Sequence, residues 1–235
     1  MNDCAILGGA GAVGSAIAEA LSGHYSVQIL DVKQPQEPQP CGVLHVALRW
    51  SDDFLATVLD CIHATKPSLV IVHSTVPVGT TRRLGENAVH SPVRGQHDLL
   101  GPSLYWFVKY VAGPQAAAAK AHLEEAGLRC DIADTRPETT ELAKLLCLSR
   151  LLSDLAWYEF ASQQCAALGV SRDFLHCWTR SYNSGYGDAR FTRAELQFPD
   201  GAVGGHCVWQ GSTLLDHPYI DHLQDIFPLM EVEHV

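Results

Sequence analysis

Short apolar runs alternate with helical patterns through the first half of the chain. Seven runs predict strands: 4–7, 26–30, 42–48, 68–72, 88–90, 109–113 and 129–133. Apolar residues at helical spacing predict three helices between them: 12–21, 52–64 and 115–126. This alternation is typical of a parallel sheet covered by helices. We therefore expect an α/β fold, a Rossmann-type doubly wound parallel sheet, in a domain over residues 1–134.

One long helical pattern, from 137 to 168, dominates the second half. Leucines recur along it at steps of three and four residues: Leu142, Leu145, Leu148, Leu152 and Leu155. Gly169 is expected to end this helix, and a shorter helix is expected over 173–180. We therefore expect a smaller α-helical domain over 135–235, which contains the long helix and a cysteine-bearing loop. The leucine face is wide enough to pack against a second subunit, so we expect a homodimer through this helix.

Glycines follow the first predicted strand in a pattern that fits Gly-x-Gly-x-x-Gly. Gly9 permits a tight turn, Gly11 lets the backbone approach a pyrophosphate, and Gly14 lets the helix pack on the strand. The backbone at the start of that helix, at Ala12 and Val13, would offer N–H groups to the phosphates. The pattern predicts a dinucleotide-binding turn. A βαβ turn with a purely structural role is the alternative.

The second predicted strand ends at Asp31, about twenty residues after the glycines. A carboxylate at this place accepts hydrogen bonds from an adenosine ribose. Its charge would repel a 2′-phosphate, so the sequence favours NAD over NADP as the cofactor.

Two hydroxyl side chains, Ser74 and Thr75, follow the strand predicted at 68–72. Ligands of open α/β sheets bind at the carboxyl ends of parallel strands, so both residues are candidates for contact with the cofactor. A proline-glycine turn at 77–79 then leads to an expected helix start, and an ordinary N-cap with a turn is the alternative. Further along the chain, Arg94 is a candidate for binding a substrate carboxylate or phosphate, with a surface ion pair as the alternative.

A thiol follows a pair of glycines near the end of the chain, in the segment 204–207. Glycine lets the backbone reach positive φ and lets a ligand approach closely, so Cys207 is a candidate nucleophile for a substrate carbonyl. Gly205 and His206 are candidate substrate-binding residues. The glycine lets a ligand approach the backbone closely, and the histidine side chain can titrate near neutral pH. A small buried thiol in a turn is the alternative.

Composition limits the classes of partner. The chain has 235 residues and a formal net charge of −10, so nucleic acids and anionic membrane surfaces would be repelled. It has neither a membrane-length apolar run nor a signal-peptide pattern, so we expect a cytoplasmic protein. Eight cysteines without a Cys-x-x-Cys pair indicate reduced thiols. Twelve histidines without His-x-x-x-His or His-Glu-x-x-His spacing indicate that there is no metal site.

Four segments, in this order along the chain, resemble the UDP-glucose/GDP-mannose dehydrogenase family. They are the glycine turn, Ser74 to Thr80, the helix start from Glu141 to Lys144 with a later Glu159, and Gly204 to Cys207. Together they span most of the chain. Enzymes of that family oxidise a nucleotide-sugar alcohol to a carboxylate in two NAD-dependent steps, through a covalent thiohemiacetal on the cysteine.

The resemblance implies catalytic roles for three side chains. Thr75 would contact the substrate or an ordered water, Lys144 would stabilise the developing oxyanion, and Cys207 would be the nucleophile. A cation near a thiol also favours the thiolate. The pattern of the helix alone favours a solvated lysine at 144, which is the alternative. The expected substrate is a small alcohol, sugar-like or acidic.

The chain departs from the family pattern at three polar positions. It has Val93 where the family has a glutamate, Leu148 where the family has an asparagine, and Gly211 where the family has an aspartate. The region between Asp31 and Ser74 is shorter than in the family, and the C-terminal nucleotide-sugar-binding domain has no counterpart in this sequence. Two alternatives therefore stay open: a catalytically degenerate NAD-binding sensor or accessory protein, and a 3-hydroxyacid-type dehydrogenase.

Overall fold

The computed structural model describes residues 2–33, 36–185, 193, 195 and 206–226. The chain divides into two compact units, Met1–Lys144 and Leu145–Val235. The boundary lies inside the long helix, later than the boundary expected at residue 134. The first two turns of this helix are therefore part of the α/β unit.

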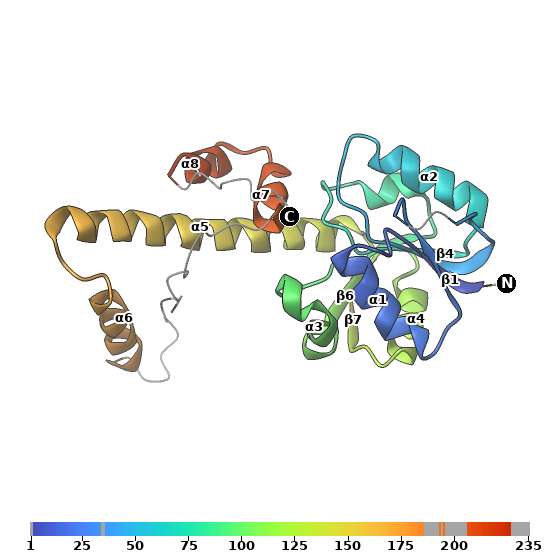
Figure 1. Ribbon diagram of the computed structural model, residues 1–235, viewed down its shortest axis with the longest axis horizontal. Coiled ribbons are helices and arrows are strands. Elements are labelled where there is room, and N and C mark those ends of the chain that lie inside the picture. Colours follow the sequence, from blue (N-terminus) through green and yellow to red (C-terminus); the bar gives the residue numbers. More distant parts are fainter. Residues whose placement is uncertain (1, 34–35, 186–192, 194, 196–205, 227–235) are drawn as a thin grey trace. The chain divides into compact units, whose positions relative to one another are not determined.

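A seven-stranded sheet forms the centre of the first unit, in the order β2-β1-β3-β4-β5-β6-β7 (Figure 1). The strands are β1 Asn2–Leu7, β2 Val27–Leu30, β3 Cys41–Val46, β4 Leu69–Val72, β5 Ala88–His90, β6 Lys109–Ala112 and β7 Cys130–Asp134. Each corresponds to a predicted strand. The Rossmann-type fold is confirmed.

The direction of β6 differs from the expected parallel sheet. Strands β1 to β5 pair in parallel, whereas β5 and β6 are antiparallel, with His90 opposite Ala112, and β7 is parallel to β6. The sheet is therefore mostly parallel with one antiparallel pairing, which the sequence did not reveal, because an apolar run predicts a strand but carries no information on its direction. The first residue of β6, Lys109, consequently lies at the carboxyl edge of the parallel strands.

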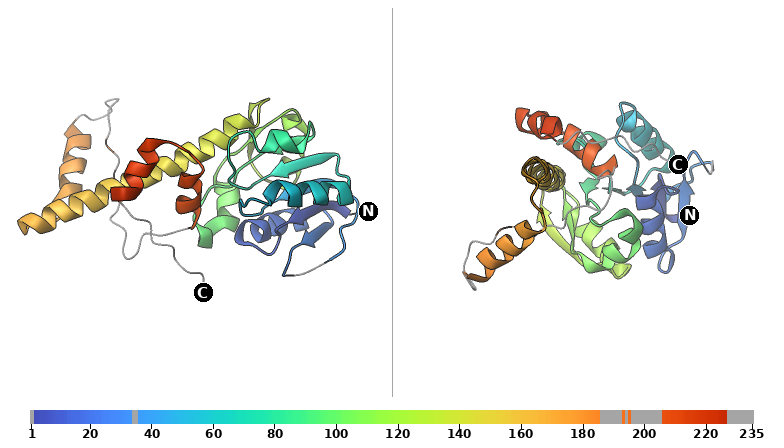
Figure 2. Two further views of the ribbon diagram at one scale, coloured as in Figure 1. Left: turned by 90° about the horizontal axis from the view of Figure 1, so that it is seen from above. Right: turned by 60° about the vertical axis from the view of Figure 1, so that its left-hand side comes forward.

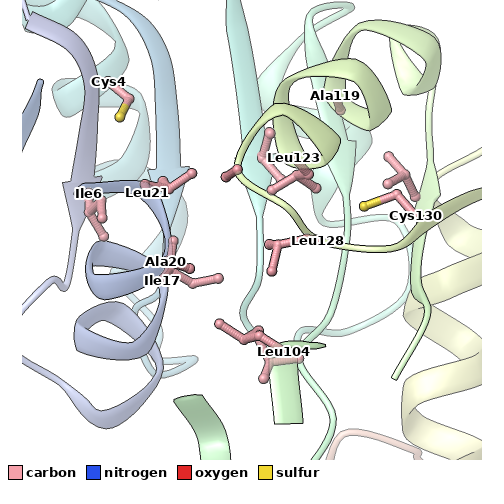
Figure 3. Close-up of a cluster of buried hydrophobic side chains, with 14 of the residues drawn as sticks. Cys4, Ile6, Ile17, Ala20, Leu21, Leu104, Ala119, Leu123, Leu128 and Cys130 are labelled. Carbon is pink, nitrogen blue, oxygen red and sulfur yellow. The ribbon is translucent and has the colours of Figure 1, made fainter. Parts of the chain in front are cut away.

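Helices cover both faces of the sheet. They are α1 Ala12–Ser22, α2 Phe54–Thr65, α3 Leu100–Trp106 and α4 Ala116–Glu125, with short 3₁₀ helices η1 Thr81–Leu84 and η2 His97–Leu99. One buried cluster joins α1, α3 and α4 to one face, and another joins α2 to the other face. Figure 3 shows the first cluster, with Ile17 and Leu21 of α1 and Leu123 of α4. Helix α3 was not predicted, since Gly101 and Pro102 interrupt its pattern.

The described part of the second unit is helical. Helix α5 spans Glu138–Leu168 and is seen along its length in the left-hand view of Figure 2. It is followed by α6 Phe174–Gly185, α7 His206–Thr213 and α8 Pro218–Ile226. Leu152 and Ala156 of α5 form a buried cluster with Ile220 and Leu223 of α8. Burial of these four side chains supplies a hydrophobic core for the unit.

Gly169 ends α5 as predicted. It has a φ of +66°, and the next N–H, of Val170, donates to the carbonyl of Cys165 at 3.0 Å. The predicted cysteine-bearing loop was wrong for Cys207, which lies in α7. Val208 of this helix packs against the buried cluster of the unit, so packing outweighs the glycine-rich context.

The described cysteines are free of disulfide bonds: Cys4, Cys41, Cys61, Cys130, Cys147, Cys165 and Cys177. The first four are buried, and burial raises the pKa of Cys4 to about 12 and that of Cys130 to about 11. Within the described residues, no group of three or more His, Cys, Asp or Glu side chains is arranged to hold a metal ion. None of the described helices combines the length and the apolar character needed to cross a membrane.

Candidate functional site

The glycine turn between β1 and α1 has no room for a side chain at two of the predicted positions. A Cβ on Gly9 would lie 2.8 Å from Cγ2 of Ile29, and a Cβ on Gly14 would lie 2.7 Å from the Cα of Gly9. Gly11 differs, because its Cβ position has only the carbonyl oxygen of Gly8 nearby, at 3.4 Å, and the residue is exposed. Gly9 and Gly14 are thus required for packing, while Gly11 leaves the backbone open to a ligand.

The start of α1 suits an anionic group. No described side chain caps this helix at Gly11, and its first turn contains no acidic residue. Ala12 is exposed and Val13 is half-buried. The first N–H groups of a helix lack partners within it and carry its partial positive charge, so this end fits a pyrophosphate.

Asp31 lies at the end of β2, against the glycine turn. Its Oδ2 accepts a hydrogen bond from the N–H of Ala10 at 3.0 Å, and its Oδ1 accepts one from the N–H of Lys33 at 2.9 Å. Two backbone donors therefore hold the half-buried carboxylate in place, and each oxygen keeps a lone pair for another donor. The open turn, the uncapped helix and this fixed carboxylate together fit a dinucleotide. The binding roles of these residues stay predictions.

A buried carboxylate of α5 holds the segment that follows β4. Glu141 is 1% exposed; its Oε2 accepts from the N–H of Gly79 at 2.6 Å, and its Oε1 accepts from the N–H of Thr81 at 2.8 Å. Gly79 has a φ of +92°, a conformation that favours glycine. The expected α-helix start is only the 3₁₀ helix η1, which Gly85 ends with a φ of +124°.

His90 links the backbone of Ser74 to the first turn of α5. Its Nε2 donates to the carbonyl of Ser74 at 3.1 Å, and its Nδ1 lies 2.8 Å from Oγ1 of Thr140. Because a carbonyl only accepts, Nε2 carries the proton and Nδ1 accepts from the threonine. Ser74 is buried and Thr75 is half-buried, at the carboxyl edge of the sheet. The structure thus connects Ser74 to the helix that carries Lys144.

Two lysine ammonium groups bind carbonyls of the segment 91–93. Nζ of Lys144 donates to Val93 at 3.0 Å, and Nζ of Lys109 donates to Ser91 at 2.8 Å. Burial, together with the positive charges of Lys144 and Arg94, lowers the pKa of Lys109 to about 7. The next residue, Arg94, is exposed, and its guanidinium donates to the carbonyl of Val108 at 2.6 Å. Binding of a substrate anion by Arg94 stays a prediction.

Buried histidines line this edge of the sheet, and our reading of the sequence missed them. His45 and His90 lie in β3 and β5, and His73 directly follows β4. Burial lowers the pKa of His45 and of His73 well below the ordinary range and that of His90 to about 3, so these rings are neutral at pH 7. The available signal was a histidine inside, at the end of, or directly after each of three successive apolar strands.

The second unit contains the other predicted residues. His206 and Cys207 form the start of α7, and Gly205 lies outside the described residues. Their roles therefore stay predictions. Two departures from the family pattern meet inside this unit: a Cβ on Gly211 would collide with Cδ1 of Leu148, which is 7% exposed. An apolar contact thus stands where the resemblance implies two polar side chains.

No protein-family model matches the sequence, and no curated protein matches it. Among solved structures, the fold is similar to that of UDP-D-ManNAc dehydrogenase from Pyrococcus horikoshii, with a TM-score of 0.78 and 18% identity over 95% of this chain and 67% of that chain. The 3-hydroxyisobutyrate dehydrogenase of Mycobacterium tuberculosis gives a TM-score of 0.72 and 18% identity over 97% of this chain and 93% of that chain. An imine reductase from Myxococcus stipitatus, in complex with NAD⁺, gives a TM-score of 0.61 and 12% identity over 79% of this chain and 74% of that chain. These likenesses establish the fold.

Proposed function

We propose that the chain is an NAD-dependent oxidoreductase of the UDP-glucose/GDP-mannose dehydrogenase type, which acts on the CH–OH group of a sugar-like or acidic small alcohol. The observation that carries this proposal is the carboxylate of Asp31, which two backbone N–H groups hold beside the glycine turn. The exposed Gly11 and the uncapped start of α1 support it. The similar folds named as dehydrogenases, and the reductase with NAD⁺, support the class of reaction.

In this proposal each predicted residue has a chemical role. Bound NAD would accept a hydride from the carbon that bears the hydroxyl group. Asp31 would hold the adenosine ribose, and Ser74 would lie beside the nicotinamide half of the site. The ammonium of Lys144 would stabilise the negative oxygen as the hydroxyl proton leaves, and Thr75 would orient the substrate or a water. The thiolate of Cys207 would then attack the carbonyl carbon of the product.

Titration of the protein with NAD⁺ and with NADP⁺ tests the first step. The variant Asp31→Asn keeps the shape of the side chain but loses its charge and one acceptor, so we expect NAD⁺ to bind at least about tenfold more weakly, with a smaller loss for NADP⁺. The matched control is Asp3→Asn. Asp3 also accepts from a backbone N–H between β1 and β2, that of Ser26 at 2.9 Å, but at the opposite edge of the sheet. The control should bind NAD⁺ like the wild type.

Turnover tests the chemistry. The proposal expects an alcohol whose oxidation is lost in Lys144→Ala and in Cys207→Ser. A protein that binds neither NAD⁺ nor NADP⁺ would disprove the proposal. Activity that survives Cys207→Ser but not Lys144→Ala would instead support the 3-hydroxyacid type of reaction.

The contact between Leu148 and Gly211 favours a second candidate function. It places an apolar side chain where the resemblance implies polar groups around the reacting carbonyl. A protein of this kind would bind NAD without catalysis and serve as a sensor or accessory subunit. It would bind NAD⁺ in the titration, oxidise none of a broad panel of alcohols, and have a Cys207 thiol of ordinary reactivity toward alkylating agents.

We also propose a homodimer through α5. The second unit has large exposed apolar side chains on α5 and on α6: Trp157, Phe160, Leu168, Phe174 and Trp178. Helix α6 has no buried residue within the described part of the chain. Large apolar side chains in contact with water are typical of an interface, and a second copy of this chain would cover an apolar surface with an equally apolar one.

A further inference from the structure

Three histidine rings connect the surface of α4 with the carboxyl edge of the sheet. His122 of α4 is half-buried, and its Nε2 lies 3.0 Å from Nε2 of His45. The other nitrogen of His45, Nδ1, lies 3.0 Å from Nε2 of His73. Nδ1 of His73 lies 3.3 Å from Nζ of Lys109 and 2.8 Å from the carbonyl oxygen of Ser91. Each ring therefore uses a different nitrogen toward each neighbour along the series.

The two inner rings are aligned for proton transfer. The planes of His45 and His73 differ by 9°, and their centroids are 5.3 Å apart. The distance between the centroids is close to the 3.0 Å between the two nitrogens plus the distance from each nitrogen to its own ring centre. Both nitrogens therefore lie on the line that joins the two ring centroids. That is the geometry of an N–H···N bond in the ring planes. Side chains alternate between the two faces of the sheet along β3, so Leu44 and Val46 face α2 while His45 faces α4. This alternation places the His45 ring between His73 and His122.

Neutral rings allow only two arrangements of protons along this series. In the first, Nδ1 of His73 accepts from the ammonium of Lys109, and every ring then donates outward: His73 to His45, and His45 to His122. In the second, Nδ1 of His73 donates to the carbonyl of Ser91, and every ring then donates inward. All three tautomers differ between the two arrangements, while the total ring charge stays at zero.

We propose that Lys109, His73, His45 and His122 form a proton-transfer path between the candidate site and the surface of α4. A proton leaves Nζ of Lys109 and bonds to Nδ1 of His73. The proton on Nε2 of His73 moves to Nδ1 of His45, and the proton on Nε2 of His45 moves to Nε2 of His122. The proton on Nδ1 of His122 passes to water. One proton leaves Lys109, one reaches solvent, and the rings change from the first arrangement to the second.

The use of this path in catalysis rests on the proposed function. Oxidation of an alcohol releases the hydroxyl proton as well as a hydride, and the proton must leave a site that excludes water. Lys109 and Lys144 bind the same segment, 91–93, so the inner end of the path lies beside the proposed oxyanion-binding lysine. In the reverse reaction, the path would return a proton to the site.

Every part of the path has neighbouring groups that influence its titration. The titratable and charged groups that act on its four members from outside the path are Glu125, His90, Cys130, Lys144 and Arg94, and Tyr25 stacks on His122. Burial lowers the pKa of Lys109 to about 7 and keeps His45 and His73 neutral. A proton on Lys109 is therefore exchangeable near neutral pH, while the rings that carry it stay uncharged.

Nitrogen-15 NMR of the full chain, labelled at histidine, tests the path without substrate or cofactor. Long-range spectra show which nitrogen of each ring is protonated. Below pH 7, where Lys109 is charged, we expect protons on Nε2 of His73, on Nε2 of His45 and on Nδ1 of His122. Above the pKa of Lys109, about 7, all three rings should change tautomer together. In Lys109→Met, the second arrangement should persist at every pH.

His90 is an internal control in the same spectra. It is equally buried but hydrogen-bonds Ser74 and Thr140 and stays outside the path, so its Nε2 should remain protonated throughout this range. Rings that keep the same tautomers above and below pH 7, or that change at different pH values, would overturn the proposal. The histidines would then be only a fixed packing element.

His122→Ala separates this proposal from the proposed function. The residue is half-buried on a surface helix, and its loss leaves the inner rings in place. With an alcohol that the wild type oxidises, turnover should fall by up to about 10², and added imidazole should restore it. Unchanged turnover would disprove the catalytic use of the path even where the proposed function holds. If no alcohol is oxidised, the proposed function fails, and the NMR result still decides whether the path exists.

Discussion

Replacement of Glu141 by glutamine tests whether α5 holds the segment after β4. Its two carboxylate oxygens accept from the N–H groups of Gly79 and Thr81, at 2.6 and 2.8 Å, in a buried position. Glutamine keeps one acceptor oxygen but turns an NH₂ group toward the other backbone N–H. One charge-assisted bond becomes neutral, and one buried donor loses its partner.

The expected loss follows from these two bonds. A hydrogen bond to a charged group contributes about 1.5–3 kcal/mol, and a buried unsatisfied donor costs about 1–3 kcal/mol. We therefore expect Glu141→Gln to lower the free energy of unfolding of the first unit by about 2–4 kcal/mol. Because Ser74 and Thr75 precede this segment, we also expect weaker binding of NAD⁺.

Native-state hydrogen exchange measures both effects. Exchange of the β4 amides reports the stability of the unit, and exchange of the Gly79 and Thr81 amides reports the local bonds. The matched control is Glu138→Gln, one turn earlier in α5, which removes an ion pair with the exposed Arg82 at 2.6 Å. Such a pair contributes about 0–1 kcal/mol. An equal loss of unfolding free energy in the two variants would refute the reasoning, since the buried hydrogen bonds would then contribute no more than the exposed ion pair.

Three further predictions concern acid stability, the glycine turn and the dimer. Unfolded histidine takes up a proton near pH 6.5, whereas His90 in the folded protein does so only near pH 3. The free energy of unfolding should therefore fall as the pH drops across this range, by up to about 5 kcal/mol from this residue. Urea unfolding at several pH values measures this fall, and a free energy that does not change with pH would contradict the burial of a neutral His90. Gly14→Ala should lower the free energy of unfolding by about 1–3 kcal/mol, measured by thermal or urea unfolding. Gly11→Ala should leave this free energy nearly unchanged and weaken NAD⁺ binding. Similar unfolding of both variants would contradict the turn geometry. In light scattering, Trp157→Glu should convert the dimer to a monomer, whereas the control Trp106→Glu, in α3, should not; a wild-type monomer would refute the dimer.

The arrangement of the first unit followed closely from its sequence. β4 is a run of four buried apolar residues, and the glycines after β1 fix where α1 begins. The direction of β6 could not be predicted, because side-chain alternation is the same in either direction. Helix α7 could not be predicted either, since its formation depends on contacts of Val208 with residues that are distant in sequence.

The candidate site was only partly predictable for a similar reason. Asp31 and Ser74 follow strands at positions that topology brings to one edge of the sheet. The series His122, His45 and His73 joins residues up to 77 positions apart, and only the packing of α4 on the sheet brings them together. A histidine inside an apolar strand shows that a polar partner is required but does not identify that partner.

The contact between Leu148 and Gly211 couples the side chains that these two positions can carry. A side chain introduced at 211 would meet the leucine, and an asparagine at 148 would keep two terminal atoms on Cγ, branched like the leucine methyl groups. The two substitutions are therefore expected to be strongly non-additive. Either single change is expected to destabilise the unit: an aspartate at 211 through overlap with Leu148, and an asparagine at 148 through burial of an amide in place of an apolar side chain. A change of chemistry at this contact therefore requires both residues to change together.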